Sequence, residues 1–320
     1  MKKQLLILTT LLTVSNFSTL ASECLYQNGK VEINESVLEN LKLVEIATAK
    51  FSRNDNLYIN SATGIHLEDK RVQRTSKSPK FLDAVGRLTV TFVDNTIGYC
   101  TANLTDTTPG RASRTLTTAK HCLTNKRSGA KLKSMKWETK LKDGSVISMP
   151  ATVEMSDKSS DTALLSLPIV IPFSKIKPLL LESEYYFTPI DIQSYSKNTI
   201  AAGFSADKEI GEGGKKMTYT DNLQNKNLRN IGNSRYLLNT FNYEGGSGGA
   251  LIADADMSEE DIDNPYNQKY LIGIASSILD SEYITARSSN GALGSNTTVY
   301  IDYTRFFIDD GHKMFDRINE

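Results

Sequence analysis

The sequence predicts an all-β fold, and three of its features point that way. Short runs rich in β-branched and aromatic residues recur from Phe81 to Asp302, and such runs are typical of strands. Turn residues separate them. Few of the segments between them have helical periodicity. Many short strands with few intervening helices indicate a β-barrel or a β-sandwich.

Length and charge restrict the function. With 320 residues, the chain can hold one large domain or two of ordinary size. Its 37 basic and 37 acidic residues cancel, which argues against a protein that binds nucleic acid or a membrane surface by bulk charge. Beyond the N-terminus, no segment is long and apolar enough to span a bilayer, so we expect a soluble product.

Residues 1–21 are typical of a signal peptide. Lys2 and Lys3 precede an apolar run over residues 5–14, and small residues lead up to Ala21. We therefore expect cleavage after Ala21 and a secreted or periplasmic protein. Lipid anchoring at Cys24 is not expected, because Glu23 stands where a small residue is needed.

Residues 22–80 differ in texture from the rest of the chain. Apolar spacing over residues 36–51 predicts a short amphipathic helix. A polar run rich in Lys and Arg then extends to Lys80 without apolar periodicity. This stretch reads as a solvated linker or as a pro-segment cut at one of its basic residues, and the two interpretations are compatible.

Beyond residue 80, two sets of short strands are expected. The first covers residues 87–93, 98–104, 115–118, 145–149, 151–155 and 163–167. The second covers residues 189–195, 199–203, 217–220, 236–241, 250–253, 270–276 and 297–302. Residues 303–320 predict a helix with Phe306, Phe307, Met314, Phe315 and Ile318 on one face, although Gly311 weakens it.

Two stretches imitate known binding loops and fail. Residues 254–265 begin like a calcium loop, but Glu259 stands at the sixth position and Pro265 at the twelfth. Residues 211–216 contain three glycines before two lysines but lack the spacing of a phosphate loop. We interpret them as an acidic hairpin tip and a connector. No metal or cofactor site is expected.

The most distinctive stretch surrounds Ser247, which has two glycines on each side and an apolar strand after it. Glycine leaves backbone N–H groups unshielded and allows dihedral angles that a Cβ forbids. Such a turn suits a nucleophile whose own backbone stabilises the oxyanion that it generates. By itself, the motif is more often a simple turn.

Only three histidines are present. His66 and His312 lie near the ends of the chain and read as surface residues, whereas His121 comes after a predicted strand and precedes Cys122. Cys100 and Cys122 are close enough in sequence to close a modest loop, and this pairing leaves Cys24 unpaired or in a removed segment. The disulfide would hold His121 rigidly, as a general base requires.

Asp161 lies at the mouth of an apolar strand. Burying an acid there is expensive without a partner. Accepting the imidazole N–H of His121 would provide that partner and fix the tautomer.

The order of His121, Asp161 and Ser247, in the blocks Thr-Ala-Lys-His-Cys, Asp-Thr-Ala-Leu-Leu and Gly-Gly-Ser-Gly-Gly, resembles the chymotrypsin/trypsin-like serine peptidases. The resemblance spans residues 84–318. It implies two six-stranded antiparallel barrels, over residues 81–183 and 184–302, with the site between them and a C-terminal helix over residues 303–320.

The resemblance also implies roles. His121 would be the base, Asp161 its orienting acid and Ser247 the nucleophile, with the N–H groups of Gly245 and Ser247 as the oxyanion hole. Ser276 would pair its backbone with extended substrate. Phe241 would form the floor of the primary specificity pocket, with Ile278 and Thr298 as its walls. No acid lies there, so small or apolar residues are expected before the scissile bond.

Departures from the family pattern are informative. Gly246 replaces the aspartate that binds the freed N-terminus in trypsin-like enzymes, and no Ile-Val-Gly-Gly start is present. Lys120 and residues 85–88 are more similar to the bacterial V8-type, glutamyl endopeptidase-like branch. Ala275, however, stands where that branch has its acid-binding histidine, so glutamate specificity is not expected.

The sequence supports two hypotheses. The first is a monomeric, exported serine endopeptidase, made as a zymogen, that acts on proteins or peptides without metal or cofactor and without nucleic-acid or membrane partners. The second is an inactive peptidase-fold protein that binds peptides or proteins. The sequence does not determine the substrate, the processing site or the role of Cys24.

Overall fold

A computed structural model describes most of the chain beyond residue 68. The described residues are 42–45, 69–156, 160–181, 189–194, 196–220, 228–231, 234–238, 240–255, 266–280, 285–287, 289–290, 292–295, 298–301 and 311–319. The chain divides into two units, residues 1–42 and 43–320. The fold and the site described here belong to the second unit.

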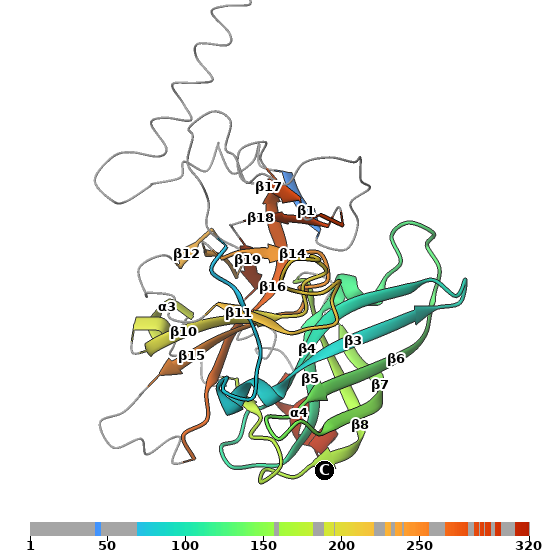
Figure 1. Ribbon diagram of the computed structural model, residues 1–320. Helices are drawn as coiled ribbons and strands as arrows, with labels where there is room; N and C mark the ends of the chain where they lie inside the picture. Colours follow the sequence, from blue (N-terminus) through green and yellow to red (C-terminus); the bar gives the residue numbers. More distant parts are fainter. Residues whose placement is uncertain are drawn as a thin grey trace, which may run out of the picture. The chain divides into compact units, whose positions relative to one another are not determined.

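The first half of this unit is a closed six-stranded antiparallel barrel (Figure 1). Its strands are β3 (Val85–Phe92), β4 (Ile97–Asp106), β5 (Ser113–Ala119), β6 (Leu132–Lys140), β7 (Val146–Ser156) and β8 (Thr162–Ile171). They pair in the order β4-β3-β6-β7-β8-β5, and β5 pairs with β4 to close the circle. We call this the first barrel.

Alternating side chains fill the first barrel. Leu88 and Val90 of β3 are fully buried, and so is Trp137 of β6. The indole Nε1 of Trp137 donates to the Ala102 carbonyl at 3.0 Å, so the buried N–H is satisfied. Gly86 is needed beside this ring, because a Cβ there would lie 2.2 Å from the indole nitrogen. The barrel is thus packed around Trp137.

The second half is also built from antiparallel strands. Six of them pair in the order β11-β10-β15-β16-β19-β13. They are β10 (Ser196–Gly203), β11 (Thr218–Thr220), β13 (Arg235–Leu238), β15 (Ala250–Ala255), β16 (Tyr270–Asp280) and β19 (Thr298–Ile301). Short strands β9 (Leu179–Leu180), β12 (Arg229–Asn230), β14 (Asn242–Tyr243), β17 (Thr285–Arg287) and β18 (Leu293–Ser295) complete it.

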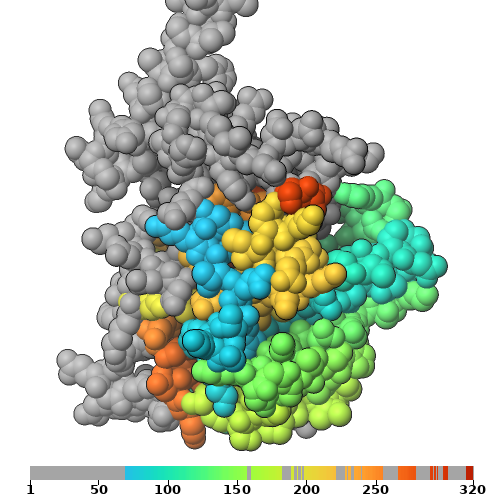
Figure 2. Space-filling view, viewed as in Figure 1, coloured from blue at the N-terminus to red at the C-terminus, as the bar shows by residue number. Residues whose placement is uncertain are grey.

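The stretch before the first barrel packs on the second half. Strand β2 (Val72–Gln73) pairs with β11, and Figure 2 shows this blue segment against yellow residues of the later chain. The short 3-10 helix η1 (Lys80–Ala84) then leads into β3. The Arg74 side chain is 8% exposed and forms an ion pair with Asp83 of η1. Where it is described, this basic run is therefore part of the folded unit, because its arginines have acidic partners.

The all-β prediction is confirmed, with one short helix at the C-terminus. Helix α4 begins at the Gly311 that was expected to weaken it and ends at Asn319. Phe315 and Ile318 are buried, and Asn319 donates to Asp106 at 2.9 Å. The helix is therefore attached to the first barrel by apolar packing and by this side-chain hydrogen bond.

Several elements differ from expectation. Strand β6 was not predicted, because its lysines obscure the inward alternation of Met135, Trp137 and Thr139. Residues 145–155, expected as two strands, form the single strand β7, since Pro150 fits an extended backbone.

Two further segments change type. Residues 189–195 were expected as a strand, but helix α3 (Pro189–Ser194) forms there, because proline suits the first turn of a helix. In the predicted helix 36–51, the described residues form strand β1 (Lys42–Glu45), which pairs with β16. Strand pairing outweighs helical spacing in so short a stretch.

Several predictions lie outside the described residues. These are the signal peptide 1–21, Cys24, His66, Glu259, Pro265, Phe306 and Phe307. Within the described segments, no helix combines the length and the apolar character that a membrane crossing requires.

The expected disulfide is present. Cys100 of β4 and Cys122, in the 3-10 helix η2 (Lys120–Leu123), are joined across 22 residues of sequence. We expect the variant with both Cys100→Ser and Cys122→Ser to lose about 3 kcal/mol of unfolding free energy, because the reduced chain regains loop entropy. Urea denaturation followed by circular dichroism measures the loss. Cys24→Ser is the matched control, and an equal loss in that variant would contradict the prediction.

Candidate active site

The turn that carries Ser247 covers residues 244–249 and connects β14 to β15. We call it the serine turn. Gly245 and Gly248 have φ of 86° and 78°, in the left-handed region that favours glycine. A Cβ on Gly248 would lie 2.1 Å from the Thr101 carbonyl of β4. The backbone of the turn thus lies directly against the first barrel, and glycine at position 248 permits this approach.

Hydrogen bonds fix the turn on both sides. The Thr101 N–H donates to the Ser247 carbonyl at 2.7 Å, and the Asn103 side chain donates to the Gly248 carbonyl at 2.8 Å. From the second half, the Gly248 N–H donates to the Ala275 carbonyl at 2.7 Å. Ser247 is therefore held between the two halves of the unit.

Two donors of the turn remain available. The Gly246, Gly248 and Gly249 N–H groups all donate to backbone carbonyls. Among the described residues, the N–H groups of Gly245 and Ser247 have no such acceptor. These are the two groups that the sequence predicted as an oxyanion hole, and an oxygen that develops negative charge is the ligand that they suit.

His121 lies in η2, directly beside the Cys100–Cys122 disulfide. Its Nε2 is 2.8 Å from the Ser247 hydroxyl oxygen. Its Nδ1 is 2.6 Å from Asp161 Oδ2, and its backbone N–H donates to Asp161 Oδ1 at 2.8 Å. The structure therefore brings the three predicted side chains together, and the carboxylate holds the imidazole with one nitrogen toward the serine.

Asp161 is kept ionised by its neighbours. Burial alone would raise the pKa of this carboxyl, but hydrogen bonds from His121 and Ser276 and the charge of His121 lower it. The Ser276 hydroxyl donates to Oδ2 at 2.6 Å. The sequence assigned Ser276 only a backbone role, so this side-chain bond was missed, and no local signal pointed to it.

A groove opens beside His121. It has a volume of about 520 Å³, and its lining includes Ile97, Tyr99 and Cys122 of the first barrel together with Glu244 and Gly245. His121 and Gly245 both line the groove. A peptide lying in it would pass both.

The predicted specificity residues are all buried. Ile278 and Thr298 are register partners between β16 and β19, and the Thr298 hydroxyl donates to the Thr240 carbonyl at 3.0 Å. Phe241 lines a small cavity of about 10 Å³ with Gly246 and Tyr300, which is room for about one water molecule. Ile278 and Thr298 are thus adjacent, whereas Phe241 lies beside the serine turn.

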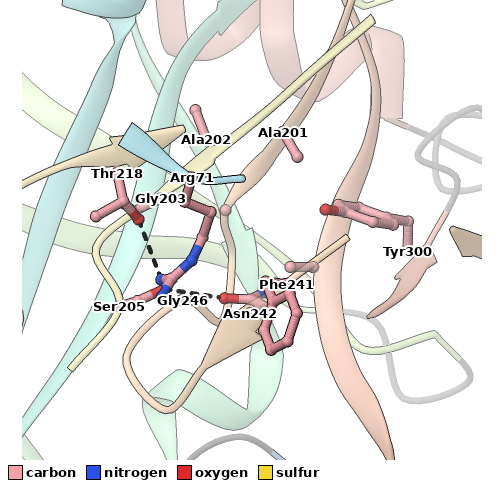
Figure 3. Close-up of a pocket in the computed structure, with 12 residues that line it drawn as sticks. Arg71, Ala201, Ala202, Gly203, Ser205, Thr218, Phe241, Asn242, Gly246 and Tyr300 are labelled. Atoms are coloured by element: carbon pink, nitrogen blue, oxygen red, sulfur yellow. Dashed lines mark hydrogen bonds between the residues drawn. The ribbon is translucent and has the colours of Figure 1, made fainter. Parts of the chain in front are cut away.

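Asn242 explains why position 246 is glycine. A Cβ on Gly246 would lie 1.9 Å from Asn242 Oδ1. That oxygen accepts from the Ser205 hydroxyl at 3.2 Å and from the Tyr243 N–H at 3.0 Å, and Figure 3 shows the Asn242 amide beside Ser205 and Gly246. The asparagine side chain thus fills the space next to residue 246.

The stretches 254–265 and 211–216, which imitate a calcium loop and a phosphate loop, also include described residues. Asp254 forms an ion pair with Lys269. Of the glycine stretch, Gly211 is fixed by the carboxylate of Asp207, which accepts its N–H at 3.0 Å. In the described residues, no group of three or more His, Cys, Asp or Glu is arranged to hold a metal ion.

Comparisons with known proteins give solved structures only. No protein-family model and no curated protein matches this chain. A glutamyl endopeptidase structure is 14% identical and covers 79% of this chain and 97% of its own, with a TM-score of 0.48.

Two further structures are comparable. The thermostable serine protease AL20 from an extremophilic microorganism is 12% identical, covers 75% of this chain and 99% of its own, and has a TM-score of 0.49. The protease Anisep from Arthrobacter nicotinovorans is 13% identical, covers 73% and 93%, and has a TM-score of 0.46. Each is similar to this chain in fold only.

The contact between Asn242 and residue 246 generates a first test of the site. We expect Gly246→Ala to lose about 1–3 kcal/mol of unfolding free energy, because the new methyl group overlaps Asn242. Adding Asn242→Ala should restore part of the loss, and thermal denaturation of both single variants and the double variant measures the coupling. Losses that simply add would contradict this account of the turn.

A second test concerns the pKa of Asp161. We expect Ser276→Ala to raise the lowered pKa, because it removes a donor to the ionised carboxylate. A carboxyl with a lowered pKa contributes stability that is present above its ordinary value of 3.8 and is lost as the pH falls through the folded value.

The variant should therefore lose less unfolding free energy than the wild type between about pH 6 and about pH 2. Urea denaturation at several pH values measures the slope. Ser277→Ala, which removes a buried hydroxyl from the same strand, should keep the wild-type slope. A wild-type slope in Ser276→Ala would refute the prediction.

Proposed function

We propose that the protein is an exported serine endopeptidase that hydrolyses peptide bonds through an acyl-enzyme. The observation that carries this proposal is one line of contacts: Ser247 Oγ to His121 Nε2 at 2.8 Å and His121 Nδ1 to Asp161 Oδ2 at 2.6 Å. A serine hydroxyl is a weak nucleophile at its own pKa and needs an adjacent base. This order of groups provides one, together with a carboxylate that orients it.

In the proposed first step, Ser247 Oγ attacks the carbonyl carbon of the scissile bond while His121 Nε2 accepts the hydroxyl proton. Negative charge develops on the carbonyl oxygen, and the N–H groups of Gly245 and Ser247 stabilise it. Asp161 stabilises the imidazolium by its ionised carboxylate and does not take the proton. The lowered pKa of Asp161 supports this assignment.

In the second half of the reaction, His121 gives the proton to the leaving amine, and the carbon–nitrogen bond breaks. The acyl group stays on Ser247. Water then attacks the ester, with His121 again as the base, and the serine is restored. The groove of about 520 Å³ beside His121 has the volume to hold the peptide on one side of the scissile bond.

Specificity is proposed from the same sequence positions. Phe241, Ile278 and Thr298 are apolar or uncharged, which favours small or apolar residues before the scissile bond over Lys or Arg. We propose protein or peptide substrates, a secreted or periplasmic location, and processing of the N-terminal segment.

The triad is tested by substitution. Ser247→Ala should lower kcat for peptide hydrolysis by about 10⁶-fold, because it removes the nucleophile. Asp161→Asn should lower kcat by about 10⁴-fold, because the amide no longer fixes the correct tautomer of His121. A fluorophosphonate probe with mass mapping should label Ser247 in the wild type only.

Ser166→Ala is a suitable control, since Ser166 is on β8 of the first barrel and its hydroxyl bonds Glu154 rather than the site. It should keep wild-type turnover. Peptide binding by the wild type without turnover or labelling would instead favour an inactive peptidase-fold protein, and normal cleavage by Ser247→Ala would refute the mechanism.

A further inference from the structure

Arg71 is a buried cation that the proposed chemistry does not use. Its guanidinium donates from Nη2 to Asp69 at 2.6 Å and from Nη1 to Asp207 at 2.9 Å. A weaker contact from Nη1 reaches the Thr218 hydroxyl at 3.4 Å. Only 3% of the side chain is exposed. Such a charge is costly to bury unless it is fully paired. Arg71 and its two carboxylates therefore hold one another in position.

The Arg71 guanidinium is positively charged. Burial alone would lower the pKa of the guanidinium, but the hydrogen bonds and charges of Asp69 and Asp207 outweigh burial and raise it above its usual range. Arg71 therefore stays cationic and keeps both carboxylates in place.

Through Asp207, Arg71 holds the loop after β10. One Asp207 oxygen receives Arg71, and the other accepts the N–H groups of Ile210 and Gly211 at 2.9 and 3.0 Å. The residues just before Asp207 contact the serine turn. Ser205 donates to Asn242, and the Ala206 N–H donates to the Glu244 carbonyl at 2.6 Å.

Arg71 also contacts β14, the strand that leads into the turn. Its guanidinium carbon lies 4.6 Å from the centre of the Tyr243 ring, over the ring face, a geometry in which the cation is attracted to the aromatic ring. Figure 3 shows the Arg71 side chain reaching toward Ser205, Gly246 and Asn242. The cation thus contacts both the loop and the strand that leads into the turn.

The Ala206–Glu244 bond fixes the direction of a predicted oxyanion donor. The Glu244 carbonyl and the Gly245 N–H belong to one planar, trans peptide unit, so they point in opposite directions. When Ala206 holds the carbonyl on one side, the Gly245 N–H must point to the other. Gly245 at φ 86° would be free to turn over without that bond.

We propose that Arg71 is a positioning residue for the oxyanion-binding N–H of Gly245, acting through Asp207, Ala206 and Glu244. This inference rests on the proposed function. A side chain at position 246 cannot hold the turn in place, because Asn242 occupies that space. Arg71, a cation from the N-terminal segment, holds the turn instead. An active enzyme must accordingly retain Arg71.

Arg74 provides the matched control. It is also an arginine of the same segment, its side chain is 8% exposed, and it is paired with Asp83, but the other partners of its guanidinium are the carbonyls of Leu82 and Lys140. None of these bonds joins Arg74 to the serine turn. Loss of Arg74 should therefore cost stability without changing the direction of the Gly245 N–H.

The test compares Arg71→Met, Arg71→Lys and Arg74→Met as processed proteins that retain residue 69 and all that follows, at a temperature where each is folded by circular dichroism. Arg71→Met should lower kcat by about 100-fold with little change in KM, because the loss is confined to the oxyanion. Arg71→Lys should lose less, since it keeps the charge but not the forked geometry. Arg74→Met should keep wild-type kcat.

A peptide aldehyde with the best substrate sequence adds a readout that a purely structural role would not change. Its tetrahedral adduct needs the Gly245 N–H, whereas binding of the product peptide does not. Arg71→Met should weaken aldehyde inhibition by about 100-fold and leave product binding unchanged. Equal weakening of both would overturn the proposal.

Hydrogen–deuterium exchange gives a result that does not depend on activity. The N–H groups of Gly246, Gly248 and Gly249 should exchange faster in Arg71→Met than in Arg74→Met. If Arg71→Met does not fold, Asp207→Asn replaces it, with the same expectations.

Wild-type kcat together with wild-type exchange in Arg71→Met or Asp207→Asn would overturn the proposal while the endopeptidase assignment stood. A wild type with neither turnover nor probe labelling would overturn both.

Discussion

The close approach of the 245–249 turn to strand β4 is the constraint on which the site depends. Thr101 donates its N–H to the Ser247 carbonyl, and Gly248 passes so near the Thr101 carbonyl that no side chain fits. These contacts join the two halves of the unit at the residue that is proposed to react. Because β4 also carries Cys100, the Cys100–Cys122 disulfide attaches the segment that contains His121 to the same strand. The distance between imidazole and hydroxyl is thus set by a few short backbone contacts.

The charged side chains around the site have hydrogen-bonding or oppositely charged partners. Asp161 is surrounded by donors, and Arg71 has a carboxylate on each side. Unpaired, either charge would be expensive to bury, so each determines the position of its partners. This physical cost explains why residues that never touch a substrate can still control the geometry of residues that do. It also connects the N-terminal segment, through Asp207, with the turn that carries Ser247.

Much of the architecture could be predicted from local pattern, because alternating apolar residues and turn residues act over a few positions. The failures share one cause. Strand β6 was not predicted, because its exposed lysines interrupt the apolar pattern. Helix α3 was predicted as a strand from its apolar residues, although its first residue is a proline, which suits the start of a helix. In both places, the neighbouring elements decide the outcome, and a short window contains no information about them.

The sequence alone determined the identity and order of His121, Asp161 and Ser247, the Cys100–Cys122 pairing and the all-β class. These features depend on residue chemistry and local spacing, which a chain carries without being folded. The tertiary structure decided that the Ser276 hydroxyl bonds Asp161, that Asn242 fills the space beside Gly246, and that Arg71 is buried between Asp69 and Asp207. Such contacts join residues up to 136 positions apart, and only folding brings them within hydrogen-bonding distance.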